Sequence, residues 1–82
     1  MERVPIEGSS HIRSIGFENG MMEVEYTSGT TYRYSNITES EYQGILMAPS
    51  AGSALHAVIR SVDVTGERLP GKDLDEGIIL QI

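Results

Sequence analysis

The stretch that decides the fold is residues 12–35, IRSIGFENGMMEVEYTSGTTYRYS. Its pair Asn19-Gly20 favours a two-residue hairpin turn, because both residues accept the positive φ that a type I′ turn requires. Apolar and acidic residues then alternate, as in a strand with one buried face. Ser28-Gly29 indicates a second turn, and the alternation resumes after it. The pattern predicts a three-stranded antiparallel meander with strands at 12–17, 21–27 and 30–35 and at least one face in water.

After the meander, the apolar period changes to that of a helix. Thr38 and Glu41 fit a capping box, with the threonine as N-cap and the glutamate bonding back to it, and Pro49 ends this helix. Two stripes with spacing i, i+3, i+4 predict two short helices: Tyr42, Ile45, Leu46 and Leu55, Val58, Ile59. Neither helix is long enough to be stable alone, so both are expected to pack on the sheet. The predicted fold class is α+β, with element order β-β-β-α-α.

The chain beyond the second helix has a different composition. Residues 61–64 could form another strand, whereas residues 66–77 carry Gly, Pro and several charges and predict a mobile loop. The final residues 78–82, IILQI, favour a strand that pairs with its own sheet or with a neighbouring subunit, because a free apolar strand would promote aggregation. We therefore expect a domain at 1–61 and a C-terminal extension at 62–82.

Composition narrows the possible functions. The 82 residues include 6 Lys and Arg and 12 Asp and Glu, for a formal charge of −6, and the chain has no cysteine. The acidic balance argues against a general DNA or RNA binder, and the absence of Cys excludes disulfides, thiol nucleophiles and Cys-based zinc sites. No stretch approaches the roughly 20 apolar residues that span a bilayer, and the N-terminus lacks a signal-peptide layout, so a cytoplasmic protein is expected. Because so short a chain builds a small core, we expect a homo-oligomer.

The start of the second helix is a candidate anion site. Free backbone N–H groups and the positive end of the helix dipole favour an anion there. Gly52 would let a phosphate approach the backbone, and Ser50 and Ser53 could donate hydroxyl hydrogen bonds. The alternative is that Ser50 is an N-cap and Gly52 a packing residue. The segment is not a Walker A loop, because the lysine of that motif is missing.

Two further groups of residues could take part in binding. Ser9, Ser10 and His11 precede the first predicted strand and could line a polar site with Arg13 nearby, or they could form a turn with satisfied hydroxyls. Tyr32 and Tyr34 share one strand face and could stack on bases, although such residues more often belong to the core.

The arginines are a third feature. Residues 1–62 contain four Arg and no Lys, and guanidinium groups grip phosphate bidentately. Arg60 at the end of the second helix could clamp a phosphate, or it could only interact with the helix dipole.

Many positions together resemble one known family, the KTSC domain. They come in the family's order over residues 8–61: SSHI at 9–12, IGF at 15–17, Val24, Tyr26, Gly29, Tyr32, Tyr34, Tyr42, and then Ala48, Ser50, Gly52, Leu55, His56, Ile59 and Arg60. The family is a small module found at the C-terminus of some lysyl-tRNA synthetases and as stand-alone proteins of bacteria and phages. Thr38 replaces a proline of the family pattern, and His56 replaces an asparagine. The resemblance implies proximity to nucleotides and adds His56 to the candidate binding residues.

Three functions follow as hypotheses. The first is a non-catalytic binder of a small phosphorylated nucleotide, which in a phage would act as a sponge for a cyclic-nucleotide immune signal. The second is a protein-interaction or structural module, with the tail strand adding to a sheet edge. The third is weak RNA binding as a synthetase appendage, which the acidic charge disfavours. No metal site is expected, because the two histidines, His11 and His56, show no metal-ligand spacing, and no cofactor is expected. Catalysis is not expected either, because the chain has no nucleophile elbow, although a Ser-His-Asp arrangement stays open as an alternative.

Overall fold

Two tight turns set the register of the central sheet. In the computed structural model, which describes residues 1–69, Asn19 and Gly20 have φ values of 53° and 80° and join β2 (Ile12–Glu18) to β3 (Met21–Tyr26). Gly29, with a φ of 97°, lies in the turn between β3 and β4 (Thr31–Ser35). Both hairpins of the predicted meander are therefore confirmed.

Within the described residues 1–69, the sheet has five strands rather than the three of the predicted meander. β1 (Arg3–Pro5) pairs antiparallel with β2, and β5 (Thr65–Leu69) pairs antiparallel with β4, so that the strand order is β1-β2-β3-β4-β5. The expectation of a strand at 61–64 was wrong, and residues 66–69, expected in a mobile loop, belong to β5. The predicted strand at 78–82 and the rest of that loop lie outside the described residues.

Sequence reasoning missed the edge strands for physical reasons. β1 is only 3 residues long and ends in a proline, which lacks the N–H that a ladder needs. β5 contains a glycine and two charged residues, a composition typical of loops. Its place is fixed by its neighbour: a Cβ built on Gly66 would lie 2.9 Å from Cε1 of Tyr34, so the tyrosine ring packs directly against this glycine.

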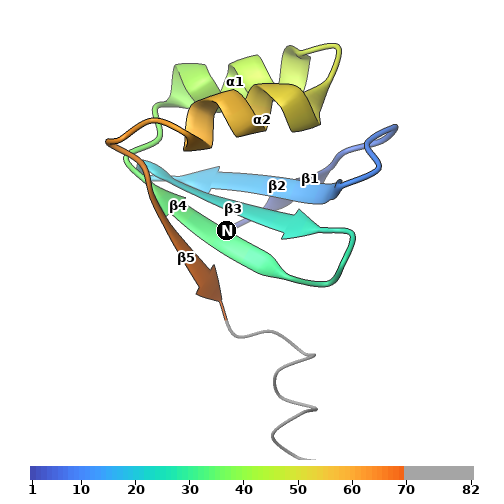
Figure 1. The fold of residues 1–82 in the computed structure, drawn as a ribbon, viewed down its shortest axis with the longest axis horizontal. Coiled ribbons are helices and arrows are strands. Elements are labelled where there is room, and N and C mark those ends of the chain that lie inside the picture. The colour runs from blue at the N-terminus through green and yellow to red at the C-terminus, as the bar shows by residue number, and fades with distance from the viewer. Residues whose placement is uncertain (70–82) are drawn as a thin grey trace, which may run out of the picture.

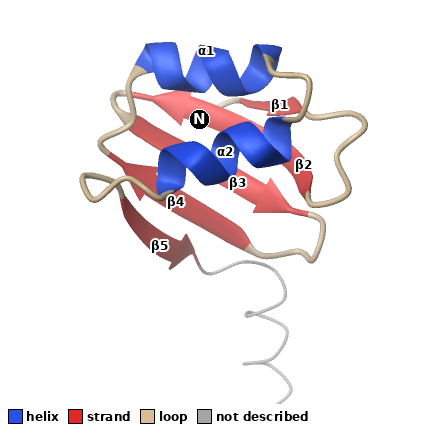
Figure 2. Cartoon of the chain, turned by 45° about the horizontal axis from the view of Figure 1, so that its top comes forward, coloured by secondary structure: helices blue, strands red, loops and turns tan. Residues whose placement is uncertain are grey.

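Both helices cover the same face of the sheet, as Figures 1 and 2 show. α1 (Glu39–Met47) begins at the predicted capping box of Thr38 and Glu41, and α2 (Ala51–Ile59) begins at the N-cap Ser50. Under the helices lie side chains of the three central strands. The buried core consists of Ile12, Ile15, Met22, Val24, Tyr34, Ile37, Tyr42, Ile45 and Leu55. The predicted packing of two amphipathic helices on the meander is confirmed.

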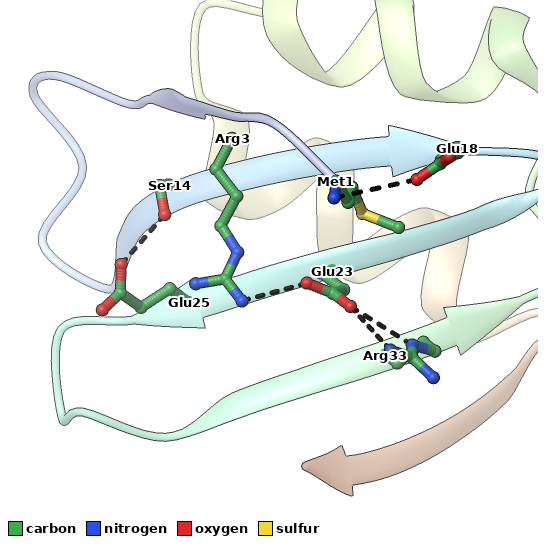
Figure 3. A network of polar contacts seen from close by, with 7 residues as sticks. All are labelled: Met1, Arg3, Ser14, Glu18, Glu23, Glu25 and Arg33. Carbon is green, nitrogen blue, oxygen red and sulfur yellow. Dashed lines mark hydrogen bonds and ion pairs between the residues drawn. The ribbon is translucent and has the colours of Figure 1, made fainter. Parts of the chain in front are cut away.

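The opposite face of the sheet is polar and centres on Glu23 (Figure 3). This glutamate is only 8% exposed, because Arg3 from β1 and Arg33 from β4 lie over it. Each arginine places a guanidinium nitrogen 2.9 Å from a different oxygen of the carboxylate. The pKa of Glu23 is lowered, chiefly by the hydrogen bond from Arg33, and burial opposes the shift. These ion pairs link β1 and β4, which lie on either side of β3 in the strand order, to Glu23 on β3.

Candidate functional site

A pocket of about 800 Å³ opens between the β1–β2 loop and the start of α2. The loop (residues 6–11) and the α1–α2 connection lie at the same end of the molecule in Figures 1 and 2. The pocket lies within the roughly 300–1,000 Å³ range of small-molecule sites. Seven residues singled out from the sequence line it: Ser9, Ser10, His11, Ser50, Gly52, Ser53 and His56. The fold therefore joins two segments that are about forty residues apart in the sequence.

Hydrogen bonds hold the β1–β2 loop, which forms one wall of the pocket. They come from the hydroxyl of Ser9 in this loop and from Thr27 in the β3–β4 turn. Ser9 Oγ accepts hydrogen bonds from the backbone N–H groups of His11, at 3.3 Å, and Ile12, at 3.0 Å. Thr27, in the β3–β4 turn, donates from Oγ1 to the Ser10 carbonyl at 3.0 Å and from its amide to the His11 carbonyl at 2.9 Å. The predicted turn with a satisfied hydroxyl is therefore present at Ser9, and the loop that carries Ser10 and His11 is anchored at both ends.

The helix wall is the first turn of α2. Ser50 is the N-cap: its Oγ accepts a hydrogen bond from the Ser53 amide at 3.3 Å and lies 3.2 Å from Ser53 Oγ. An α-helix leaves its first amides without an intrahelical acceptor, and Ser50 satisfies only that of Ser53. A Cβ built on Gly52 would meet no atom within 4 Å. No neighbouring group therefore packs where a side chain of residue 52 would stand, and no close contact requires a glycine there.

Apolar side chains form the base of the pocket. Ile12 and Leu55 are buried in the core, while Ile6, Leu46 and Ile59 are partly buried around them. Together with the serines and histidines at the rim, they give the pocket an apolar base and a polar mouth. This arrangement suits a ligand with an apolar ring and a polar or charged group.

Tyr26 adds an aromatic wall that the predicted site did not include. Its hydroxyl lies 2.7 Å from the Tyr34 hydroxyl, and its ring packs edge-on against Tyr32 with the ring centroids 6.0 Å apart. Burial raises the pKa of Tyr34, and the hydrogen bond with Tyr26 adds to this shift. Tyr32 and Tyr34, predicted as possible ligand contacts, do not line the pocket. Tyr34 belongs to the core, and both hold Tyr26 in place.

The two predicted phosphate-binding arginines lie outside the pocket. Arg13 points toward the β3–β4 side, where it lies 3.6 Å from Glu25 and 3.5 Å from the Thr27 carbonyl. Arg60 is the C-cap of α2 and is not itself a lining residue, although the preceding residue, Ile59, lines the pocket. The role of these two residues as clamps beside the serines is therefore not supported by their position.

Glu7 is a further polar lining residue that sequence reasoning missed. It lies in the β1–β2 loop and is the one side chain with a formal charge among the lining residues that the structure describes. The sequence gives only one signal for this residue, its place directly before Gly8-Ser9 in a segment that favours a turn. Within residues 1–69, no three His, Asp or Glu side chains come together as a metal site, and no helix is long and apolar enough to cross a membrane.

Comparison with known proteins places this geometry in a family. The sequence model of the KTSC domain matches residues 8–62. The chain belongs to the KTSC domain family. This KTSC domain is 37% identical over 62 residues to an uncharacterized protein of Stutzerimonas stutzeri (strain A1501), which covers 73% of this chain and 86% of the relative. It also resembles the crystal structure of a KTSC domain protein from Yersinia pestis, with a TM-score of 0.74 and 30% identity over 83% of this chain and 96% of the other.

The matched segment contains both walls of the pocket from Gly8 onward. β1 and β5 lie outside it, at the two edges of the sheet. The resemblance inferred from the sequence is thus confirmed.

Proposed function

We propose that this KTSC domain is a non-catalytic binding protein for a small phosphorylated nucleotide and that the pocket between the β1–β2 loop and α2 is its site. The observation that carries the proposal is the convergence of Ser9–His11 and Ser50–His56 on one cavity. Hydroxyl groups, the amides of Ala51 and Gly52 and two imidazoles supply hydrogen-bond donors for a phosphate. Tyr26 and the apolar base supply a surface for the base. A protein that holds such a ligand without converting it would act as a sponge where the ligand is a cyclic-nucleotide immune signal.

A thermal-shift screen of the purified full chain tests this proposal. The panel contains nucleoside monophosphates, triphosphates, cyclic mononucleotides and cyclic dinucleotides. A ligand that binds only the folded state stabilises it by about 2.7 kcal/mol at a hundred times its Kd, which for a domain of this size raises the Tm by about 10 °C or more. No shift with the whole panel would overturn the proposal and leave the protein-interaction module as the better hypothesis.

Two substitutions locate the site. His56→Ala removes an exposed imidazole at the pocket, whereas Arg68→Ala removes an exposed cation on β5, outside the pocket lining. We expect His56→Ala to weaken binding several-fold and Arg68→Ala to leave the Kd within about twofold of the wild type. The reverse order would place the ligand elsewhere on the molecule.

A further inference from the structure

The pocket has an unusual charge balance for a phosphate site. Among the lining residues that the structure describes there is no Lys or Arg, and the only formally charged side chain is the carboxylate of Glu7. The remaining polar groups are hydroxyls, backbone amides and the imidazoles of His11 and His56. The site therefore offers donors to an anion but little formal positive charge.

None of the arginines in residues 1–69 is among the lining residues. Arg3 and Arg33 hold Glu23 on the far face of the sheet, each at 2.9 Å. Arg13 lies 3.6 Å from Glu25, and Arg68 lies on the edge strand β5. Arg60 is the C-cap that follows the lining residue Ile59. The lining itself therefore contains no guanidinium group.

Such a site discriminates by ligand charge. Each negative charge of a ligand loses part of its hydration on entering the pocket and is repelled by the carboxylate of Glu7. Only neutral hydrogen-bond donors of the pocket offset this unfavourable free energy. A single charge spread over one phosphodiester can be satisfied by a few aimed N–H and O–H groups. Further charges, as on a monoester or a triphosphate, add repulsion without adding partners.

We infer that the pocket selects singly charged phosphodiester ligands of the cyclic mononucleotide type over monoesters and triphosphates, with Glu7 as the specificity-determining residue. This inference rests on the proposed function and names the ligand class for the same site. Because Coulomb energy scales with the product of the charges, removing Glu7 should help a ligand in proportion to its own charge. A purely structural role for Glu7 would change all affinities by one common factor.

Calorimetric titration of the full chain tests the inference with six probes: the cyclic monophosphate, monophosphate and triphosphate of adenosine and of guanosine, at low salt and without divalent cations. For at least one nucleoside, the wild type should bind the cyclic form most tightly and the triphosphate least tightly. Glu7→Gln should tighten monophosphate binding about twofold to fivefold and triphosphate binding more, with the smallest gain for the cyclic form. These gains should shrink when salt is raised to about 0.5 M, because salt screens exposed charges.

Glu67→Gln is the matched control. Glu67 is exposed on β5 and does not line the pocket, so its substitution changes the net charge equally and should leave the selectivity unchanged. Triphosphate binding tighter than cyclic monophosphate binding, or equal effects of the two substitutions, would overturn the inference and leave the proposed function standing. If none of the six probes binds, the inference about charge selectivity is overturned. The proposed function is overturned as well only if cyclic dinucleotides also fail to bind.

Discussion

At the scale of single residues, Gly16 shows how closely the N-terminal segment packs on the sheet. A Cβ built on this glycine would lie 2.6 Å from the Glu2 carbonyl oxygen and 3.0 Å from Met1 Cγ. Backbone cannot move away as a flexible side chain can, so Gly16→Ala should displace β1. We expect the substitution to lower the free energy of unfolding by about 1–3 kcal/mol, measured by urea denaturation.

Gly44→Ala is the control for this substitution. Gly44 lies in α1, where a Cβ would meet no atom within 4 Å, so alanine should raise the free energy of unfolding by up to about 1 kcal/mol. A Gly16→Ala variant as stable as wild type would show that Met1–Arg3 does not pack on β2 in solution.

Glu23 predicts how stability depends on pH. Hydrogen bonds from Arg33 and Arg3 lower its pKa in the folded protein below the ordinary value of 4.5, despite burial. The unfolded chain therefore binds a proton more readily than the folded one. The contribution of Glu23 is present above the unfolded pKa and is lost as pH falls through the lower, folded pKa. Wild-type stability should accordingly fall between about pH 5 and pH 3.

Glu23→Gln isolates this contribution. The variant should be about 2 kcal/mol less stable than wild type at neutral pH, because the glutamine leaves both guanidinium groups without their anion. Its denaturation midpoints should fall less steeply with acid, whereas the control Glu7→Gln, an exposed carboxylate of the β1–β2 loop, should follow the wild-type slope. Parallel pH profiles for wild type and Glu23→Gln would contradict the assignment.

Residue-level reasoning from the sequence found the small polar residues of the pocket but misplaced the arginines. Ser50 and Ser9 follow local rules for caps and turns, which a sequence displays directly. The partner of Arg33 depends on register: Glu23 and Arg33 face each other across β3 and β4 because the turn at Gly29 fixes their pairing. The contact from Arg3 also needs β1, whose three residues give no periodic signal.

At the scale of secondary structure elements, the central hairpins and helices were predictable because each carries its own signal. Asn19-Gly20 and the Thr38 capping box are local features, and the apolar stripes of α1 and α2 follow the helical period. β5 has no such signal. It is held in place by its pairing with β4, where the ring of Tyr34 packs directly against Gly66. The joining of the β1–β2 loop to the start of α2 is also a tertiary outcome, which no local pattern contains.

The first turn of α2 separates helix stability from ligand binding. Gly52 lines the pocket and meets open space, so Gly52→Ala should not lower the Tm and should favour the helix slightly. The added methyl group would keep a phosphate away from the amides, so nucleotide affinity should fall about threefold or more. Gly44→Ala, which makes the same change in α1 outside the pocket, should keep wild-type affinity in the same titration. Equal affinities for all three proteins would show that the ligand does not approach this turn.

At the scale of the whole molecule, the sheet formed by residues 1–69 ends in two edge strands, β1 and β5, and the core of this described part contains 9 buried hydrophobic residues. So small a core is commonly supplemented by association between subunits, and exposed strand edges favour pairing with another chain. We therefore expect light scattering of the purified chain to give a mass above that of the 9.0 kDa monomer.

Residues 78–82 are the segment to delete in testing this expectation, since their apolar, β-favouring composition suits pairing between chains. The shortened chain should scatter as a smaller particle at the same concentration, with an unchanged circular dichroism spectrum as the control for folding. If the mass is the same with and without these residues, the tail does not hold the subunits together, and association must use the edges of β1 or β5. Substitutions that place a charge on each edge, such as Glu67→Lys on β5 and Val4→Lys on the exposed side chain of β1, would then show which edge pairs between copies. The added charge is buried only at the edge that pairs, so only there should it lower the mass.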